Sequence, residues 1–151
     1  MKLKLGVIDV PEPEGGTSHS VGVELEKNYQ LFSRFADYDM PNIVKDLEES
    51  IKGGLETYCI TGQLPKDMFA ASSAETEHRL HTFITEGTVE TLGIPGVPTK
   101  AALEGRTLRT KTGKQIRKVK KGQEFKEIIG KRRASFVYSG IFEASLKVWV
   151  D

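Results

Sequence analysis

The sequence is poor in cysteine, histidine and aromatic residues, and it has no long hydrophobic run. Of its 151 residues, one is a cysteine, three are histidines and 8% are aromatic. A single cysteine excludes an internal disulfide framework. No segment approaches the roughly 18 apolar residues of a membrane span, and the first ten residues have too short an apolar run for a secretory signal peptide. We expect one domain, residues 1–151, with no membrane partner.

Motifs for enzymatic chemistry are incomplete. Residues 111–113, Lys-Thr-Gly, match one element of the penicillin-recognising serine enzymes, but no Ser-x-x-Lys supplies a nucleophile. The Gly-Lys pairs at 113–114 and 130–131 lack the earlier glycine and the following serine or threonine of a phosphate-binding loop. With no assembled catalytic groups, an enzyme is the least favoured class of function.

The residues of a metal site are equally incomplete. His78 and His81 are three residues apart, so they share one face of a helix that also carries Glu75 and Glu77. Two imidazoles do not complete a ligand set, and His19 is the only other histidine. We expect a solvated helix face here, with no metal and no cofactor.

Charge is distributed unevenly, although the net charge is only +1. Residues 100–133 contain thirteen lysines and arginines against three glutamates, a balance of +10, so the remainder of the chain carries −9. This layout suits non-specific contact with DNA, and it equally suits self-association between the basic segment of one subunit and the acidic face of the next. A solvated loop is a third interpretation. The candidate subunit-interface or DNA-facing residues are Arg106, Arg109, Lys111, Lys114, Arg117, Lys118, Lys120, Lys121, Lys131, Arg132 and Arg133.

Apolar residues at alternate positions predict a half-buried strand near each end of the chain, at residues 3–7 and 146–150. Prolines and glycines after the first strand predict a flexible loop or arm over residues 11–20. Thr17, Ser18 and Ser20 are possible caps of a helix that follows.

Two further helices are expected. Asp39 is a candidate N-cap for the clearer one, over about residues 41–60. Its apolar residues recur every four positions, which predicts one buried stripe made of Ile43, Leu47, Ile51, Leu55 and Cys59. Cys59 is therefore expected to be a small core residue rather than a nucleophile. The Gly53-Gly54 pair predicts close packing or a kink, because each glycine weakens a helix by about 1 kcal/mol. The second helix is expected over about residues 74–85.

These elements predict an α+β fold. We expect a small, mostly antiparallel sheet that includes both termini, packed by one long and one or two shorter helices, with a long basic loop over residues 106–133. The long helix is expected to pack across the sheet. Residues 139–145 predict a single helical turn before the last strand, since Gly140 permits backbone geometry that other residues resist and Ser139 can cap the turn.

The candidate residues of this C-terminal turn and strand are Ser139, Gly140, Phe142, Ser145 and Trp149. An ordinary buried terminal strand and a strand that presents an edge to a neighbouring subunit are both compatible with the pattern. If the Trp149 ring is buried, its replacement by alanine is expected to cost about 3 kcal/mol.

Two segments resemble a known family. Residues 96–105 (GVPTKAALEG) and 133–150 (RASFVYSGIFEASLKVWV) resemble structural proteins from the neck and tail end of tailed bacteriophages, in particular the tail-completion or minor tail family. In that family a hydrophobic residue and Asp-Thr-Gly precede a short helical turn, a serine and a terminal strand. Here Tyr138-Ser139-Gly140 stands where Asp-Thr-Gly is usual. The resemblance covers about the last third of the chain.

The resemblance implies a non-catalytic virion protein, assembled in the host cytoplasm, that forms a ring at the head–tail junction. Its implied partners are copies of itself, a portal-side connector, and the tail terminator or tube. A tail terminator or other tail-ring protein is the nearest alternative. A basic nucleic-acid-binding module that uses residues 106–133 is the alternative from a different class.

Overall fold

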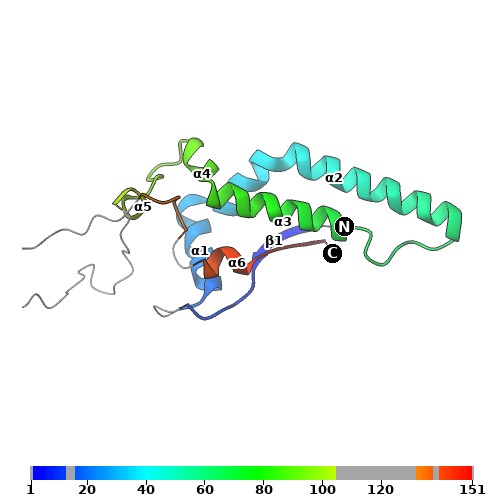
Figure 1. Ribbon diagram of the computed structural model, residues 1–151, viewed down its shortest axis with the longest axis horizontal. Coiled ribbons are helices and arrows are strands. Elements are labelled where there is room, and N and C mark those ends of the chain that lie inside the picture. Colours follow the sequence, from blue (N-terminus) through cyan, green and yellow to red (C-terminus); the bar gives the residue numbers. More distant parts are fainter. Residues whose placement is uncertain (1, 13–15, 105–131, 138–139, 151) are drawn as a thin grey trace, which may run out of the picture.

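The computed structural model describes residues 2–12, 16–104, 132–137 and 140–150. In chain order its elements are β1 (Leu3–Val7), α1 (Ser18–Tyr29), α2 (Leu31–Thr61), α3 (Ala70–Thr85), α4 (Thr88–Thr91), α5 (Lys100–Glu104), α6 (Ile141–Ser145) and β2 (Leu146–Val150). The predicted α+β class is confirmed, because helices pack against a small sheet that contains both terminal strands (Figure 1). None of the described helices is long and apolar enough to cross a membrane.

The sheet consists of β1 and β2 paired antiparallel. Leu5 lies opposite Val148 and Val7 lies opposite Leu146, so the apolar residues of both strands share one face. Beyond the end of β1, Ile8 N donates to Ser145 O at 2.7 Å and continues the ladder into α6. Both predicted strands are confirmed at the expected residues.

Helix α3 is the central layer of the molecule. It packs against β2 on one side and α2 on the other, so α2 lies beyond α3 and does not pack across the sheet as we expected (Figure 1). Leu80, Phe83 and Ile84 of α3 are buried, as their spacing predicts. The two sides of α3 therefore share one core, in which the buried hydrophobic residues are Val21, Leu31, Phe35, Ile43, Leu80, Phe83, Ile84, Val89, Ile94, Val97, Phe142, Leu146 and Val148.

Helix α1 begins with the caps that the sequence indicates. Ser20 N donates to Thr17 Oγ1 at 3.4 Å and Thr17 N donates to Ser20 Oγ at 3.1 Å, which forms a capping box. Ser18 is fully buried, and its hydroxyl donates to Ile8 O at 2.5 Å and accepts from Val10 N at 2.8 Å. Residues 18–20 of the expected loop thus form the first turn of α1 and tie it to the end of β1.

Helix α2 begins about ten residues before the predicted start, so the prediction of Asp39 as its N-cap is wrong. Gln30, with φ 55°, separates α1 from α2, and Glu26 Oε2 accepts the N–H of Phe32 at 2.8 Å at the start of α2. Pro41 lies inside the helix. Asp39 does not cap a new turn there, and its carboxylate accepts a hydrogen bond from Arg79 of α3 instead.

The predicted buried stripe of α2 is wrong over its second half. Ile43 is buried and Leu47 is partly buried, but Ile51, Leu55 and Cys59 are exposed. A four-residue step overshoots a 3.6-residue turn by about 40°, so a strict repeat moves around the helix. The buried side of α2 instead includes Ile43 and Gly54. A Cβ atom added at Gly54 would collide with Met68 Sδ. Gly54 therefore marks the predicted close packing, and Cys59 is not a core residue.

Candidate functional site

The C-terminal turn and strand have the predicted form. Gly140 precedes α6 with φ 75°, a left-handed conformation that glycine adopts without strain. Phe142 and Ser145 are buried, and the Ser145 hydroxyl donates to Phe142 O at 2.6 Å. Ser139 lies outside the described residues. The turn therefore anchors the last strand to the core just before it pairs with β1.

Trp149 lies on the outer face of the sheet and is 42% exposed. Its ring covers Gly6 of β1, where an added Cβ would lie 2.5 Å from the ring. The same face carries Lys4 opposite Trp149 and Lys147 opposite Gly6. The outer face is thus a mixed aromatic and basic surface.

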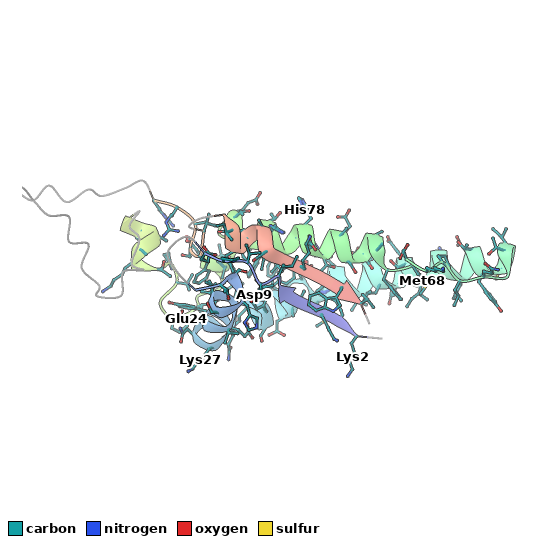
Figure 2. All side chains as sticks on the ribbon, turned by 90° about the horizontal axis from the view of Figure 1, so that it is seen from below. Lys2, Asp9, Glu24, Lys27, Met68 and His78 are labelled. Carbon is teal, nitrogen blue, oxygen red and sulfur yellow. The ribbon has the colours of Figure 1, made fainter. Side chains whose placement is uncertain are left out.

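Glu77 of α3 connects the helix layer to β2, which the sequence did not indicate. Its Oε1 lies 2.5 Å from Lys147 Nζ, and its Oε2 accepts the N–H of Val148 at 3.2 Å. The prediction of a fully solvated face around His78 is therefore wrong for Glu77, whereas His78 points away from the molecule (Figure 2). Within the described ranges, no three potential ligands gather to hold a metal ion.

The two edges of the sheet differ as a result. At β2, Glu77 accepts a backbone N–H that faces away from β1. At β1, the Ile8–Ser145 bond fixes the alternation of the antiparallel ladder, so the backbone groups of Leu3, Leu5 and Val7 face away from β2. Among the described residues, the outward backbone groups of β1 therefore form the open edge of the sheet, whereas Glu77 occupies one outward group of β2.

The described residues on either side of the basic segment are held together. Arg133 N donates to Ala102 O at 3.2 Å, and Thr99 N donates to Ser135 Oγ at 3.2 Å. Ser135 is fully buried. The segment between them, residues 105–131, therefore begins and ends at one place beside α5.

Glu90 of α4 binds the residues that follow the basic segment. Its Oε1 accepts from Ser135 N at 2.9 Å and from Ser135 Oγ at 2.7 Å, and its Oε2 accepts from Arg132 at 3.0 Å. Burial acts to raise the pKa of Glu90, but the hydrogen bonds from Ser135 and Arg132 outweigh it and hold the pKa below its ordinary value. The hydrogen bonds that hold Ser135 and Arg132 are thus made by an ionised carboxylate.

Arg132 and Arg133 are the two described members of the predicted basic set. Arg132 is exposed and paired with Glu90, and the backbone of Arg133 bonds to α5. The other nine lie outside the described residues: Arg106, Arg109, Lys111, Lys114, Arg117, Lys118, Lys120, Lys121 and Lys131. Arg132 and Arg133 thus hold the chain at the end of residues 105–131 against α4 and α5, a role that a count of charges could not reveal.

Comparisons with known proteins identify no family. No family model, curated protein or solved structure matches the chain. Two regions of the molecule itself are therefore the candidates for function. They are the C-terminal turn with its two-stranded sheet, and the fastened base of the basic segment beside α4 and α5.

Proposed function

We propose that the chain is a structural, non-catalytic virion protein at the head–tail junction of a tailed phage, acting in tail completion as part of a neck ring. The observation that carries the proposal is the C-terminal turn and strand. The segment that resembles phage tail-completion proteins forms a glycine-led helical turn, a buried serine and a strand that closes a sheet with the N-terminus.

The proposed partners are further copies of the chain, a portal-side connector, and the tail terminator or tube. Two features support assembly between copies. The open edge of β1 offers backbone groups to a strand of a neighbour. The +10 balance of residues 100–133 against −9 elsewhere favours contact between unlike segments of adjacent subunits.

Deletion of the gene from its phage tests the proposal. Filled heads and finished tails should accumulate without joining, as seen by negative-stain electron microscopy, and plasmid-borne wild type should restore joined particles. The protein should also appear in purified virions by mass spectrometry. Normal infectious particles from the deletion strain would contradict a role in joining.

The location of the protein separates a neck component from the nearest alternative, a tail terminator or other tail-ring protein. Gold-labelled antibody should bind filled heads isolated from a tail-defective strain if the protein belongs to the neck. Label on headless tails, and none on heads, would favour the tail terminator.

The basic segment supports a second candidate function, nucleic-acid binding. A module of this kind should bind duplex DNA with an affinity that falls steeply with salt, because binding releases counterions from the phosphates. Replacement of Lys118, Lys120 and Lys121 by glutamine should then remove binding. Strong binding by the purified chain, together with its absence from virions, would favour this function over the structural one.

A further inference from the structure

Helix α2 carries a row of exposed apolar side chains on the flank of its core-facing side. Val44, Ile51, Leu55 and Tyr58, here called the outer stripe, are between 37% and 54% exposed. Their spacing of seven, four and three residues keeps them on one side of a helix, over a length of about 21 Å. Figure 1 shows that α2 runs beyond the end of α3.

The outer stripe borders a shallow groove on the same helix. Ile51 and Leu55 line this groove together with Glu48, Lys52 and Cys59. Exposed apolar residues in a row on one flank of a helix are typical of an interaction site. The charges beside the stripe indicate what binds there.

A row of exposed charged residues flanks the outer stripe. Lys45, Glu48, Lys52 and Glu56 alternate in sign along the helix. From Lys45 to Glu56 the charges are positive, negative, positive and negative, and from Glu56 back to Lys45 they are negative, positive, negative and positive. A second copy of α2 laid antiparallel across the stripe, with a twofold axis near residues 50 and 51, places Lys45 opposite Glu56 and Glu48 opposite Lys52.

We propose that the outer stripe is a self-association surface that binds the outer stripe of a second copy in an antiparallel, twofold arrangement. In this register Val44 lies within about 3 Å, along the helix axis, of Leu55 in the second copy, and the two Ile51 side chains lie near the axis. In a parallel pair, this row would instead face the opposite flank of the partner helix, which does not carry the row, so these lysine–glutamate pairs would not form. Charge complementarity therefore selects both the partner, a second copy, and its direction.

The proposed contact closes on itself. A twofold interface uses the same patch on both subunits, so it yields a dimer and cannot extend into a ring. It is distinct from the open edge of β1 and from the base of the basic segment. The inference therefore concerns the purified, unassembled protein and does not depend on the proposed function.

Sedimentation equilibrium over about 1 μM to about 1 mM protein tests the interface. A monomer–dimer equilibrium is expected, and Leu55→Glu should raise the dissociation constant at least 100-fold, because it places a charge in the centre of the apolar contact. Val23→Glu is the matched control, since Val23 of α1 is equally exposed but lies off the stripe. Monomer throughout this range, or equal loss of dimer in both variants, would overturn the proposal.

Charge reversal tests the direction of pairing. Glu48→Lys should weaken the dimer at least tenfold, because it sets two lysines against each other across the interface. Adding Lys52→Glu should restore the dimer, since each lysine then faces a glutamate again. Circular dichroism of both variants should show the helix content of the wild type, which confirms that α2 remains helical. A double variant no tighter than Glu48→Lys alone would contradict the antiparallel register.

The single cysteine provides a direct distance. Cys59 is exposed, so a spin label at this position requires no other substitution. In the antiparallel register Cys59 lies opposite residue 42, so the two labels are separated by about 25 Å along the helix axis. A pulsed electron-spin distance near this value supports the proposal. A separation under about 15 Å, or rapid formation of a Cys59 disulfide under mild oxidation, would show parallel helices and overturn it.

Discussion

Asp39 is a carboxylate buried inside a helix, and its contacts explain how α2 is held. Its side chain is 3% exposed, Arg79 Nε donates to its Oδ2 at 2.7 Å, and Asn42 Nδ2 donates to its Oδ1 at 2.7 Å. Arg79 also donates to Asp46 at 2.5 Å. Burial acts to lower the pKa of Arg79, but hydrogen bonds and charge from the two aspartates raise it above its ordinary value. This cluster joins α2 to α3 beside the core.

Asp39→Asn should destabilise the protein by about 3 kcal/mol, because it removes the negative charge beside a partly buried arginine. Urea denaturation measures the loss. Glu49→Gln is the control, since the Lys45–Glu49 pair is 4.0 Å long and exposed on both sides, and such pairs contribute under about 1 kcal/mol. Equal stability of the two variants would show that the cluster does not hold the helices together.

Glu90 makes stability depend on pH. Its pKa in the folded protein lies below the ordinary value of 4.5, so its ionised form stabilises the fold above pH 4.5 and this contribution is lost as pH falls through the folded pKa. Glu90→Gln should therefore cost about 1.5 kcal/mol at neutral pH, and less below pH 4.5. Chemical denaturation at several pH values measures the difference. Glu24→Gln, at an exposed position of α1, is the control, and a cost at Glu90 that does not change with pH would contradict this role.

At the scale of elements, the sequence predicts the strands better than the long helix. Alternation in residues 3–7 and 146–150 identifies the buried face directly, because successive side chains of a strand point to opposite faces. In α2, apolar residues lie on two sides, and a four-residue repeat does not say which side meets the core. The start of α2 and the role of Glu77 depend on contacts between distant residues. No local pattern reveals them.

Gly53 and Gly54 form a matched pair for testing the packing of α2. An added Cβ at Gly53 meets nothing within 4 Å, whereas at Gly54 it would collide with the Met68 side chain. Gly53→Ala should therefore stabilise the protein by about 1 kcal/mol through helix propensity. Gly54→Ala should destabilise it by about 1 kcal/mol, because the crowding outweighs that gain. Thermal and urea unfolding measure both. Stabilisation by Gly54→Ala would show that Met68 moves aside freely.

Trp149 tests the outer face of the sheet. Because its ring is 42% exposed and rests on Gly6, Trp149→Ala should cost about 1 kcal/mol, less than the roughly 3 kcal/mol expected of a fully buried ring. Val150→Ala, at the partly buried end of the same strand, provides the comparison. A loss of 3 kcal/mol or more at Trp149 would show that the ring is covered in solution.

At the scale of the whole molecule, the surfaces available for contact are well separated. The base of the basic segment lies beside α5, at the opposite end of the long axis from the turn between α2 and α3 (Figure 1). The outer stripe faces outward from α2, and the open edge of β1 lies in the layer on the other side of α3. The residues of the hydrophobic core all lie in the part of the chain that the structure describes. Folding and assembly can therefore be separated by mutation.

Replacement of residues 105–131 by a glycine–serine linker of about six residues should leave the fold intact. The flanking residues already meet through the Arg133–Ala102 and Ser135–Thr99 bonds, so a short linker can close the gap. Closing the chain with about six residues instead of 27 lowers the entropic cost of closure by about 1 kcal/mol, and the melting temperature should stay level or rise slightly. Joining of heads and tails, measured by plasmid complementation of a deletion strain, should be lost.

The full-length variant with Lys118, Lys120 and Lys121 replaced by glutamine keeps the length of the segment and isolates the role of charge. An unfolded linker variant, or one that still joins heads to tails, would show that the segment serves the fold rather than assembly.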